Sequence, residues 1–292
     1  MDIEAQGLRA VDWNMDMPLA VIGGGNMGKA IVAGAVRSAL INPEWCVVAE
    51  PDNTKRAELA KLGVRTSMTS DEAMRHLVSW ELSGVRGQVL LAVKPQSLRE
   101  LASEVGHHLT GSDRIVISVL AGTPSRKIVS EFGGGFRVIR AMPNLPALIG
   151  QAATTVCLGE GAMAGDEEFA ERLFRGLGPV VIRAREDLMD AATAVAGSGP
   201  AYVFYLAEAM EEAAQKLGFT PEDARRLVKQ TIIGATAMMS ESSDAPSDLR
   251  AMVTSKGGTT AAACETLDTL GVRAAFVQAV EAAQARGREL GT

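Results

Sequence analysis

A chain of 292 residues, of which 47% are hydrophobic and 22% charged, is long enough for two globular domains of ordinary size. Its formal net charge of −6 argues against nucleic acid as a partner, and it has no apolar run of about 18 residues that predicts a membrane span. Residues 1–16 carry scattered charges and no apolar block, so we expect a loose N-terminal extension rather than a secretory signal. Cys46, Cys157 and Cys264 form neither a disulfide framework nor a pair of metal ligands, which favours a cytoplasmic location.

The first half of the chain alternates short apolar runs with helical patterns. This alternation predicts an α/β domain over residues 17–185 with a Rossmann-type, doubly wound and mostly parallel sheet. Ligands of such sheets bind beyond the carboxyl ends of the strands. The expected strands are 19–22, 46–49, 64–66, 89–93, 115–119, 136–140, 153–158 and 180–182, and the expected helices are 26–38, 54–62, 71–77, 96–107, 125–132 and 166–177.

A glycine turn joins the first strand to the first helix. Gly23, Gly25 and Gly28 fit the spacing GxGxxG, in which the first glycine permits the tight turn, the second lets a pyrophosphate come close to the backbone, and the third lets the helix pack on the strand. The pyrophosphate would lie on the free N–H groups at the start of the helix. A purely structural turn is the alternative, but the strand before it and the helix after it favour a dinucleotide site.

Three later segments end expected strands at the same edge of the sheet. Lys94-Pro95 follows the strand that ends at Val93, because proline does not continue a sheet interior, and Ala121-Gly122 follows the next strand. Residues 142–146, Met-Pro-Asn-Leu-Pro, make a stiff turn that suits the wall of a pocket. A surface lysine and an ordinary proline turn are the alternatives for the first and the last of these segments.

After residue 185 the pattern becomes helical, and we expect an all-α domain over residues 186–292. The expected helices are 201–217, 220–239, 249–253, 261–270 and 272–286. They are apolar over much of their circumference, so we expect a homodimer or an assembly of dimers, with docking on the first domain as the alternative. The residues that make them so apolar include Ile232, Ile233, Met238, Met239, Phe276, Val277 and Val280.

The loop over residues 254–260, Thr-Ser-Lys-Gly-Gly-Thr-Thr, is the most unusual segment of the second half. Its glycines and threonines at a helix start offer several backbone N–H groups and hydroxyls, which make an anion site suited to a small carboxylate. The loop would meet a dinucleotide only across a domain or subunit boundary. A helix cap with flexible glycines is the alternative.

Several catalytic motifs are missing from this sequence. It has no GxSxG, no HExxH and no P-loop, and its histidines, His76, His107 and His108, fall in polar segments where a surface role is expected. We therefore expect no bound metal, and the net charge and the missing apolar run argue against a nucleic acid or membrane partner. A reaction that relies on hydride from a cofactor, with little help from acids or bases, fits this pattern best.

Together the motifs resemble the pyrroline-5-carboxylate reductase family over nearly the whole chain past residue 17. The resemblance implies reduction of 1-pyrroline-5-carboxylate to L-proline by NAD(P)H, the last step of proline biosynthesis, on a Rossmann domain followed by a helical domain that interleaves with its twin. The motifs that carry it are Ile22–Gly28, Ala92–Gln96, Met142–Asn144 with Pro146, Gly197–Tyr202 and Val253–Ala261.

The resemblance also implies roles for individual residues. The Thr260 hydroxyl matches the position that hydrogen-bonds the ring nitrogen of the substrate. The pyrophosphate side would comprise Gly23, Gly24, Gly25, Asn26, Met27 and Gly28, the nicotinamide side Ala92, Val93, Lys94, Pro95 and Ala121, and the substrate carboxylate site Ser255, Lys256, Gly257, Gly258, Thr259 and Thr260. Lys256 stands where the family often has proline, which frees one backbone N–H and adds a charge.

The sequence leaves alternatives for both the cofactor and the reaction. Glu50 ends the second strand, where an acid would bind a ribose hydroxyl and favour NAD, whereas Asn53, Lys55 and Arg56 lie where a 2′-phosphate would be. We expect NADP, because the family commonly uses it, with NAD possible. Another imine or hydroxyacid oxidoreductase of similar layout is one alternative function, and a non-catalytic dinucleotide-binding protein is another.

Overall fold

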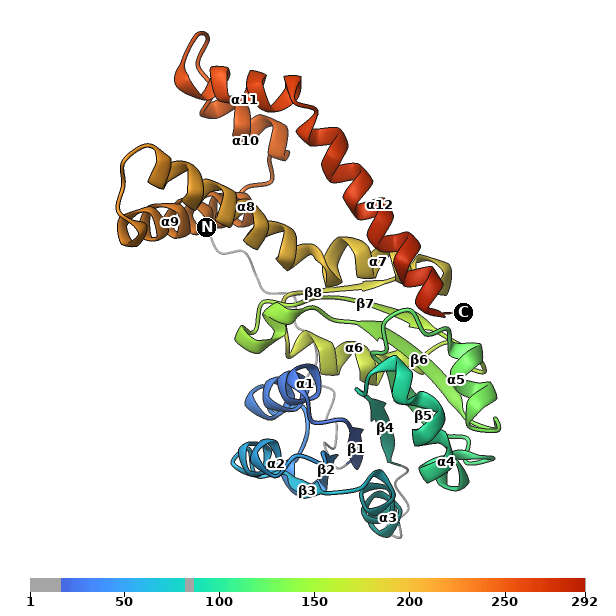
Figure 1. The fold of residues 1–292 in the computed structure, drawn as a ribbon. Helices are drawn as coiled ribbons and strands as arrows, with labels where there is room; N and C mark the ends of the chain where they lie inside the picture. Colours follow the sequence, from blue (N-terminus) through green and yellow to red (C-terminus); the bar gives the residue numbers. More distant parts are fainter. Residues whose placement is uncertain (1–16, 82–86, 292) are drawn as a thin grey trace, which may run out of the picture. The chain divides into compact units, whose positions relative to one another are not determined.

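The computed structural model describes residues 17–81 and 87–291, and the chain divides into two compact units (Figure 1). The first unit reaches to Ala196 and includes the chain again from Gly287, and the second spans Gly197–Arg286. The change from strands to helices expected after residue 185 is present, but the first unit continues past it through a short helix. The extension expected over residues 1–16 lies outside the described residues.

An eight-stranded sheet organises the first unit, in the order β3-β2-β1-β4-β5-β6-β7-β8. All neighbouring strands are parallel except β6 and β7, which run antiparallel, so the expected doubly wound and mostly parallel sheet is confirmed. The strands are β1 (Leu19–Ile22), β2 (Cys46–Ala49), β3 (Arg65–Ser67), β4 (Gln88–Leu91), β5 (Ile115–Ser118), β6 (Arg137–Met142), β7 (Ala153–Leu158) and β8 (Val180–Arg183).

Helices cover both faces of this sheet. They are α1 (Asn26–Arg37), α2 (Asn53–Ala60), α3 (Ser70–Trp80), α4 (Leu98–Leu109), α5 (Ser125–Glu131), α6 (Glu167–Arg175) and α7 (Met189–Ala192). Short 3₁₀ turns lie at Pro43–Trp45, Pro95–Ser97, Leu145–Ile149 and Glu186–Leu188, and a single π-helical turn follows α7 at Thr193–Gly197.

The core has two apolar layers, one on each face of the sheet, and β1 contributes to both. Leu19 and Val21 belong to the layer that contains residues of α1 and α6, whereas Ala20 and Ile22 belong to the layer that contains residues of α3, α4 and α5. Alternate side chains of a strand point to opposite faces, so a strand covered on both sides reads as a continuous apolar run. The Leu-Ala-Val-Ile run of β1 has this pattern, and all four residues are buried.

The second unit is all helical, as expected. Its helices are α8 (Gly199–Lys216), α9 (Pro221–Glu241), α10 (Pro246–Met252), α11 (Thr259–Thr269) and α12 (Val272–Gly291), the last turn of α12 belonging to the first unit. The Thr220 hydroxyl caps α9 by accepting a hydrogen bond from the Asp223 N–H, 3.1 Å away. Among the described residues, no helix is long and apolar enough to cross a membrane.

Several element boundaries differ from the expected ones, and three of the differences bear on the candidate site or on packing. β4 ends at Leu91 rather than Val93, and a 3₁₀ turn that begins at Pro95 precedes α4. α11 begins at Thr259, so the expected loop is shorter by two residues and Thr260 lies in the first helical turn. The last helix does not stop at residue 286 but continues to Gly291, and its last turn packs closely on Gly122: a Cβ on Gly122 would lie 2.6 Å from the Gly287 carbonyl oxygen.

Candidate active site

The glycine turn lies at the carboxyl end of β1, between its neighbours β2 and β4. The Gly23 N–H donates to the Ala49 carbonyl at the end of β2 (3.0 Å), and the Ala92 N–H donates to the Ile22 carbonyl (2.8 Å). The chain leaves β1 on one side toward β2 and later returns on its other side as β4. Such a reversal of strand order is where doubly wound sheets bind their ligands.

Each glycine of the turn has a different amount of space around it. A Cβ on Gly28 would lie 1.9 Å from the Gly23 carbonyl oxygen, and one on Gly23, whose φ is +110°, would lie 2.5 Å from the Ala92 carbonyl oxygen. A Cβ on Gly25 would meet no atom within 4 Å. Gly28 and Gly23 therefore permit close packing of the protein on itself, whereas Gly25 faces open space at the start of α1, which no side chain caps. Asn26 and Met27 form the first turn of α1.

Glu50 is buried at the end of β2 and holds this turn in place. One of its carboxylate oxygens accepts a hydrogen bond from the Gly24 N–H (3.1 Å), and the other accepts one from the Asp52 N–H (3.1 Å). The Arg56 guanidinium donates to the Glu50 carbonyl oxygen (2.6 Å) and to the side-chain oxygen of Asn53. Of the cations expected near a 2′-phosphate, Lys55 is exposed and makes no salt bridge within residues 17–81 and 87–291.

The ends of β4 and β5 lie beside the glycine turn because these strands follow β1 in the sheet. Ala92 comes closest, its Cβ lying 3.5 Å from the point that a Cβ on Gly28 would occupy. Val93 is half-buried, and Lys94 is exposed and immediately precedes the Pro95 turn. Ala121 lies past β5 and packs against a small apolar cluster formed by Met142, Cys157 and Met189.

Asn144 joins two segments of the first unit through its side chain. Its amide nitrogen donates to the Ala196 carbonyl oxygen (3.1 Å), and its side-chain oxygen accepts from the Ala153 N–H (3.1 Å). The buried side chain thus holds the end of the first unit against the start of β7.

In the second unit, the glycine-rich loop ends at the start of α11. Gly258 is the N-cap residue, and no side chain caps the helix. Gly257 has a positive φ of 72°, and the Gly258 N–H donates to the Ser255 carbonyl oxygen (3.0 Å). Ser255, Lys256 and Gly257 are exposed. The first-turn N–H groups of an uncapped helix attract negative charge, which suits a carboxylate ligand.

Thr259 and Thr260 occupy the first turn of α11, Thr259 exposed and Thr260 half-buried. By contrast, the Thr266 hydroxyl in the same helix donates to the Ala262 carbonyl oxygen (2.9 Å) and is used within the helix. Two lysines of the second unit are candidates for the acid or base that a hydroxyacid dehydrogenase would use: Lys216 forms an exposed ion pair with Glu212 on α8, and Lys229 is exposed on α9.

Two models of known protein families match stretches of this chain. A family model described as pyrroline-5-carboxylate reductase dimerisation matches residues 186–290. A second, described as NADP oxidoreductase coenzyme F420-dependent, matches residues 18–122. The first of these models covers the glycine-rich loop before α11, and the second covers the glycine turn and the ends of β4 and β5.

Similar sequences and structures span nearly the full chain. A pyrroline-5-carboxylate reductase from Synechocystis sp. is 38% identical over 280 residues, which are 95% of this chain and 99% of the relative. The structure of a pyrroline-5-carboxylate reductase from Coxiella burnetii is similar with a TM-score of 0.83 and 33% identity, over 95% of this chain and 99% of that one. A Plasmodium falciparum pyrroline carboxylate reductase with NADP bound gives a TM-score of 0.81 at 26% identity, again over 95% and 99% of the two chains.

Proposed function

We infer, since this chain belongs to the pyrroline-5-carboxylate reductase family, that it reduces 1-pyrroline-5-carboxylate to L-proline at the expense of NAD(P)H. It is thus an oxidoreductase of proline biosynthesis with a dinucleotide-binding Rossmann domain. The observation that carries this conclusion is the match to reductases of this name over 93–95% of the chain, with both units included.

We propose that the glycine turn, from Gly23 to Gly28, holds the cofactor pyrophosphate. The open space beside Gly25 and the uncapped start of α1 support this assignment, because a phosphate needs close approach and free N–H groups. Ala92 to Pro95 and Ala121, past the ends of β4 and β5, would line the nicotinamide side. When bound, the reduced nicotinamide supplies the hydride.

The loop before α11 is the proposed site of the substrate carboxylate. Its backbone N–H groups, from Ser255 to Thr260, would bind the anion, and the exposed Lys256 ammonium would add attraction from the edge. The Thr260 hydroxyl oxygen would accept a hydrogen bond from the protonated ring nitrogen and so orient the imine. A new C–H bond forms at the imine carbon while the C=N π electrons move to nitrogen, which keeps its proton. A protonated imine is already electrophilic, so orientation matters more than a strong acid.

A steady-state assay with the imine and NADPH tests the role of Thr260. Thr260→Ala should lower kcat/KM roughly 10- to 100-fold, as expected when a hydrogen bond to a charged group worth about 1.5–3 kcal/mol is lost. Thr266→Ala is the matched control on the same helix and should leave the rate unchanged, because that hydroxyl bonds within the helix. Equal rates for the two variants would contradict the assignment, and NADPH binding by the wild-type chain without proline formation would contradict the reductase activity itself.

NADP is the proposed cofactor, with NAD as the alternative. Glu50 is turned toward the backbone by its two hydrogen bonds, and Lys55, in the first turn of α2, is an exposed cation. We expect kcat/KM to be higher with NADPH than with NADH, and Lys55→Ala to raise the KM for NADPH while leaving that for NADH unchanged. Lys61→Ala, at the other end of α2, is the control. A preference of the wild-type enzyme for NADH would overturn this proposal.

We also propose a homodimer, or an assembly of dimers, in the cytoplasm. The second unit supports the dimer, because Ala224 and Val228 are its only buried hydrophobic residues while many large apolar side chains on its helices are exposed. The free thiols of Cys46, Cys157 and Cys264 fit a reducing location.

A further inference from the structure

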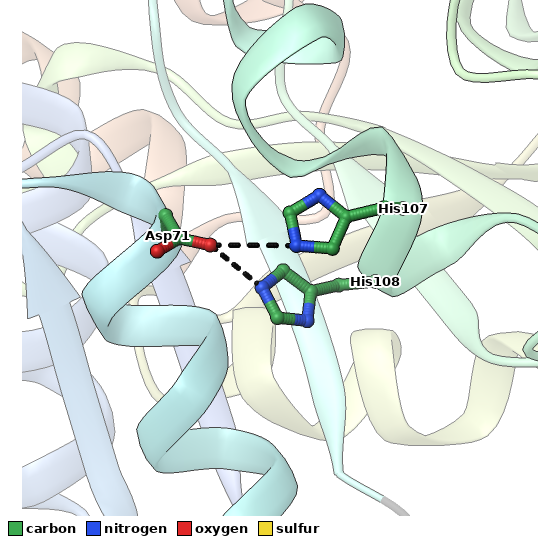
Figure 2. Close-up of side chains that lie close together, drawn as sticks. All are labelled: Asp71, His107 and His108. Atoms are coloured by element: carbon green, nitrogen blue, oxygen red, sulfur yellow. Dashed lines mark hydrogen bonds and ion pairs between the residues drawn. The ribbon is translucent and has the colours of Figure 1, made fainter.

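We propose that Asp71, His107 and His108 form a binding site for a divalent transition-metal ion, with zinc as the expected occupant. The three side chains come from two helices: Asp71 from the first turn of α3, and the two histidines from the last turn of α4. Figure 2 shows both imidazole rings directed at the same carboxylate. The proposal is independent of the reductase function, since none of these residues belongs to the proposed catalytic site.

The spacing of the three donor groups matches the coordination shell of a metal. Asp71 Oδ1 lies 2.9 Å from His108 Nε2 and 3.5 Å from His107 Nε2, and all three possible ligand atoms lie within 4.8 Å of one another. With zinc–ligand bonds of about 2.1 Å, neighbouring ligands in a tetrahedral site are roughly 3.4 Å apart. Modest opening of the cluster would therefore admit an ion at its centre.

Neighbouring groups already hold the carboxylate in position. The other oxygen of Asp71 accepts a hydrogen bond from Arg75, which leaves Oδ1 directed at the imidazoles. Glu104 on α4 accepts hydrogen bonds from the Ser70 N–H (2.8 Å) and the Asp71 N–H (3.1 Å), which fixes the start of α3 against α4. Such supporting contacts orient metal ligands and raise affinity. The negative charge of Glu104 also offsets the positive charge that Arg75 places near the ion.

The exposure of the two histidines suits a site that an ion can enter from solvent. The His108 side chain is 14% exposed, whereas that of His107 is 64% exposed and leaves one side of the cluster open. Two imidazoles and a carboxylate favour zinc, copper or nickel over magnesium or calcium, which prefer oxygen ligands alone. With three protein ligands, water would complete the coordination.

Metal titration of the full-length protein tests the proposal. Zinc is added in competition with a chromogenic chelator, and cobalt is added separately to read the coordination from its d–d absorption bands. We expect about one equivalent of zinc to bind per chain, and His107→Ala, His108→Ala and Asp71→Asn each to weaken binding about 10-fold or more. His76→Ala is the matched histidine control on α3, and Cys264→Ser removes the one partly exposed thiol; both should bind zinc as the wild type does.

The change in Tm on adding zinc distinguishes loss of metal binding from loss of folding in the variants. Zinc should raise the Tm of the wild-type protein and leave that of the three ligand variants unchanged, whatever their Tm without metal. If the wild type binds no zinc, or if His107→Ala and His108→Ala both bind it as tightly as the wild type, the cluster is an ordinary ion pair at a helix end and the proposal is wrong.

Discussion

The glycines of the β1–α1 turn differ in what a side chain would meet, and the difference separates two roles. Gly28 permits the turn to fold on itself, since a Cβ there would lie 1.9 Å from the Gly23 carbonyl oxygen. Gly25 has a φ of −64°, which any residue adopts, and its Cβ position is open. The folded chain therefore requires glycine at position 28, whereas at position 25 only a ligand would require it.

Alanine substitutions at these two positions should affect different properties, stability at position 28 and cofactor binding at position 25. Gly28→Ala should lower the free energy of unfolding of the cofactor-free protein by about 1–3 kcal/mol, because backbone must move to admit the methyl group. Gly25→Ala should leave that stability unchanged and weaken NADPH binding at least about 10-fold, or 1.4 kcal/mol. Denaturant unfolding and a fluorescence titration with NADPH measure the two effects. Equal stability of the two cofactor-free variants would contradict this account of the turn.

Two buried cysteines should be chemically inert in the folded protein. Burial raises the pKa of the Cys46 thiol to about 12 and that of Cys157 to about 11, from an ordinary value of 9.0. At pH 8 the thiolate fractions are then roughly 10⁻⁴ and 10⁻³, and the thiolate is the reactive form. In a Cys264→Ser chain, iodoacetamide at pH 8 should modify no thiol until the protein unfolds, as mass spectrometry would show.

The same shifts set a pH dependence of stability. Below about pH 9 the thiols are protonated in both states, and their contribution to stability is fully present. As the pH rises above 9, the unfolded thiols ionise while the folded ones do not, so this contribution is lost progressively toward the folded pKa values. The free energy of unfolding should therefore fall more steeply between pH 9 and 11 in the wild type than in the Cys46→Ala, Cys157→Ala chain, and an equally steep fall in both would argue against these two thiols as the cause.

At the scale of elements, the strands could be predicted well from the sequence, because a strand buried on both faces is a short run of apolar residues. The runs of β1, β2 and β7 are apolar and bounded by turn residues, and their expected and observed limits agree. The antiparallel placement of β7 beside β6 was not predictable, because strand direction depends on the connection that precedes it rather than on the strand. The last helix was expected to end at residue 286, and its further turn, which packs on Gly122, depends on a tertiary contact that the local sequence does not show.

The candidate site was predictable to a different degree in each part. The glycine turn and the loop before α11 each have a characteristic local sequence, so both could be predicted as binding segments. The inward contacts of Glu50 with Gly24 and Asp52 could not be predicted, because nothing in the sequence tells where a side chain at a strand end points. The meeting of Asp71 with His107 and His108 depends on how α3 packs on α4, and the sequence alone suggested only surface histidines.

An ion pair connects the ends of three elements in the first unit. Arg114, just before β5, donates to both carboxylate oxygens of Glu81 at the end of α3, and to the Gly87 carbonyl oxygen (3.3 Å) before β4. The side chains of Arg114 and Glu81 are only 8% and 15% exposed. Removing one member of a pair buried to this extent is costly, because the remaining charge loses its counter-charge.

Removing one member of this pair should therefore destabilise the protein strongly. Arg114→Met should lower the free energy of unfolding by about 3 kcal/mol, and adding Glu81→Leu to it should recover part of the loss. Arg75→Met, which removes an exposed partner of Asp71 on α3, is the matched control and should cost less than about 1 kcal/mol. Urea unfolding of the four chains measures the effects, and a double variant less stable than Arg114→Met would be inconsistent with the pairing.

At the scale of the whole molecule, the second unit lacks a core of its own. Large apolar side chains such as Leu270, Phe276 and Val277 are 72%, 42% and 54% exposed on its helices. A surface of this kind normally marks a protein–protein interface. The match of residues 186–290 to a dimerisation model agrees with this reading.

A charge placed on this apolar surface should separate the subunits. Phe276→Glu should weaken dimerisation roughly 30-fold or more, the effect of losing a contact of about 2 kcal/mol. Gln278→Glu adds the same charge two residues along α12 and should weaken it less. Sedimentation velocity over a range of protein concentrations gives both dissociation constants. A wild-type chain that sediments as a monomer at every concentration would contradict the proposed dimer.

The last turn of α12 has a practical consequence for anyone who shortens this protein. Gly287 and Gly291 belong to the compact unit in which β1 lies, and both pack on Gly122 just past β5, where a Cβ on Gly291 would lie 2.3 Å from the Gly122 carbonyl oxygen. From the sequence alone, deleting the final turn would be expected to affect only the helical domain. In the folded protein the deletion would remove the residues that pack on Gly122, next to Ala121 on the proposed nicotinamide side, so damage from it should appear first in cofactor affinity.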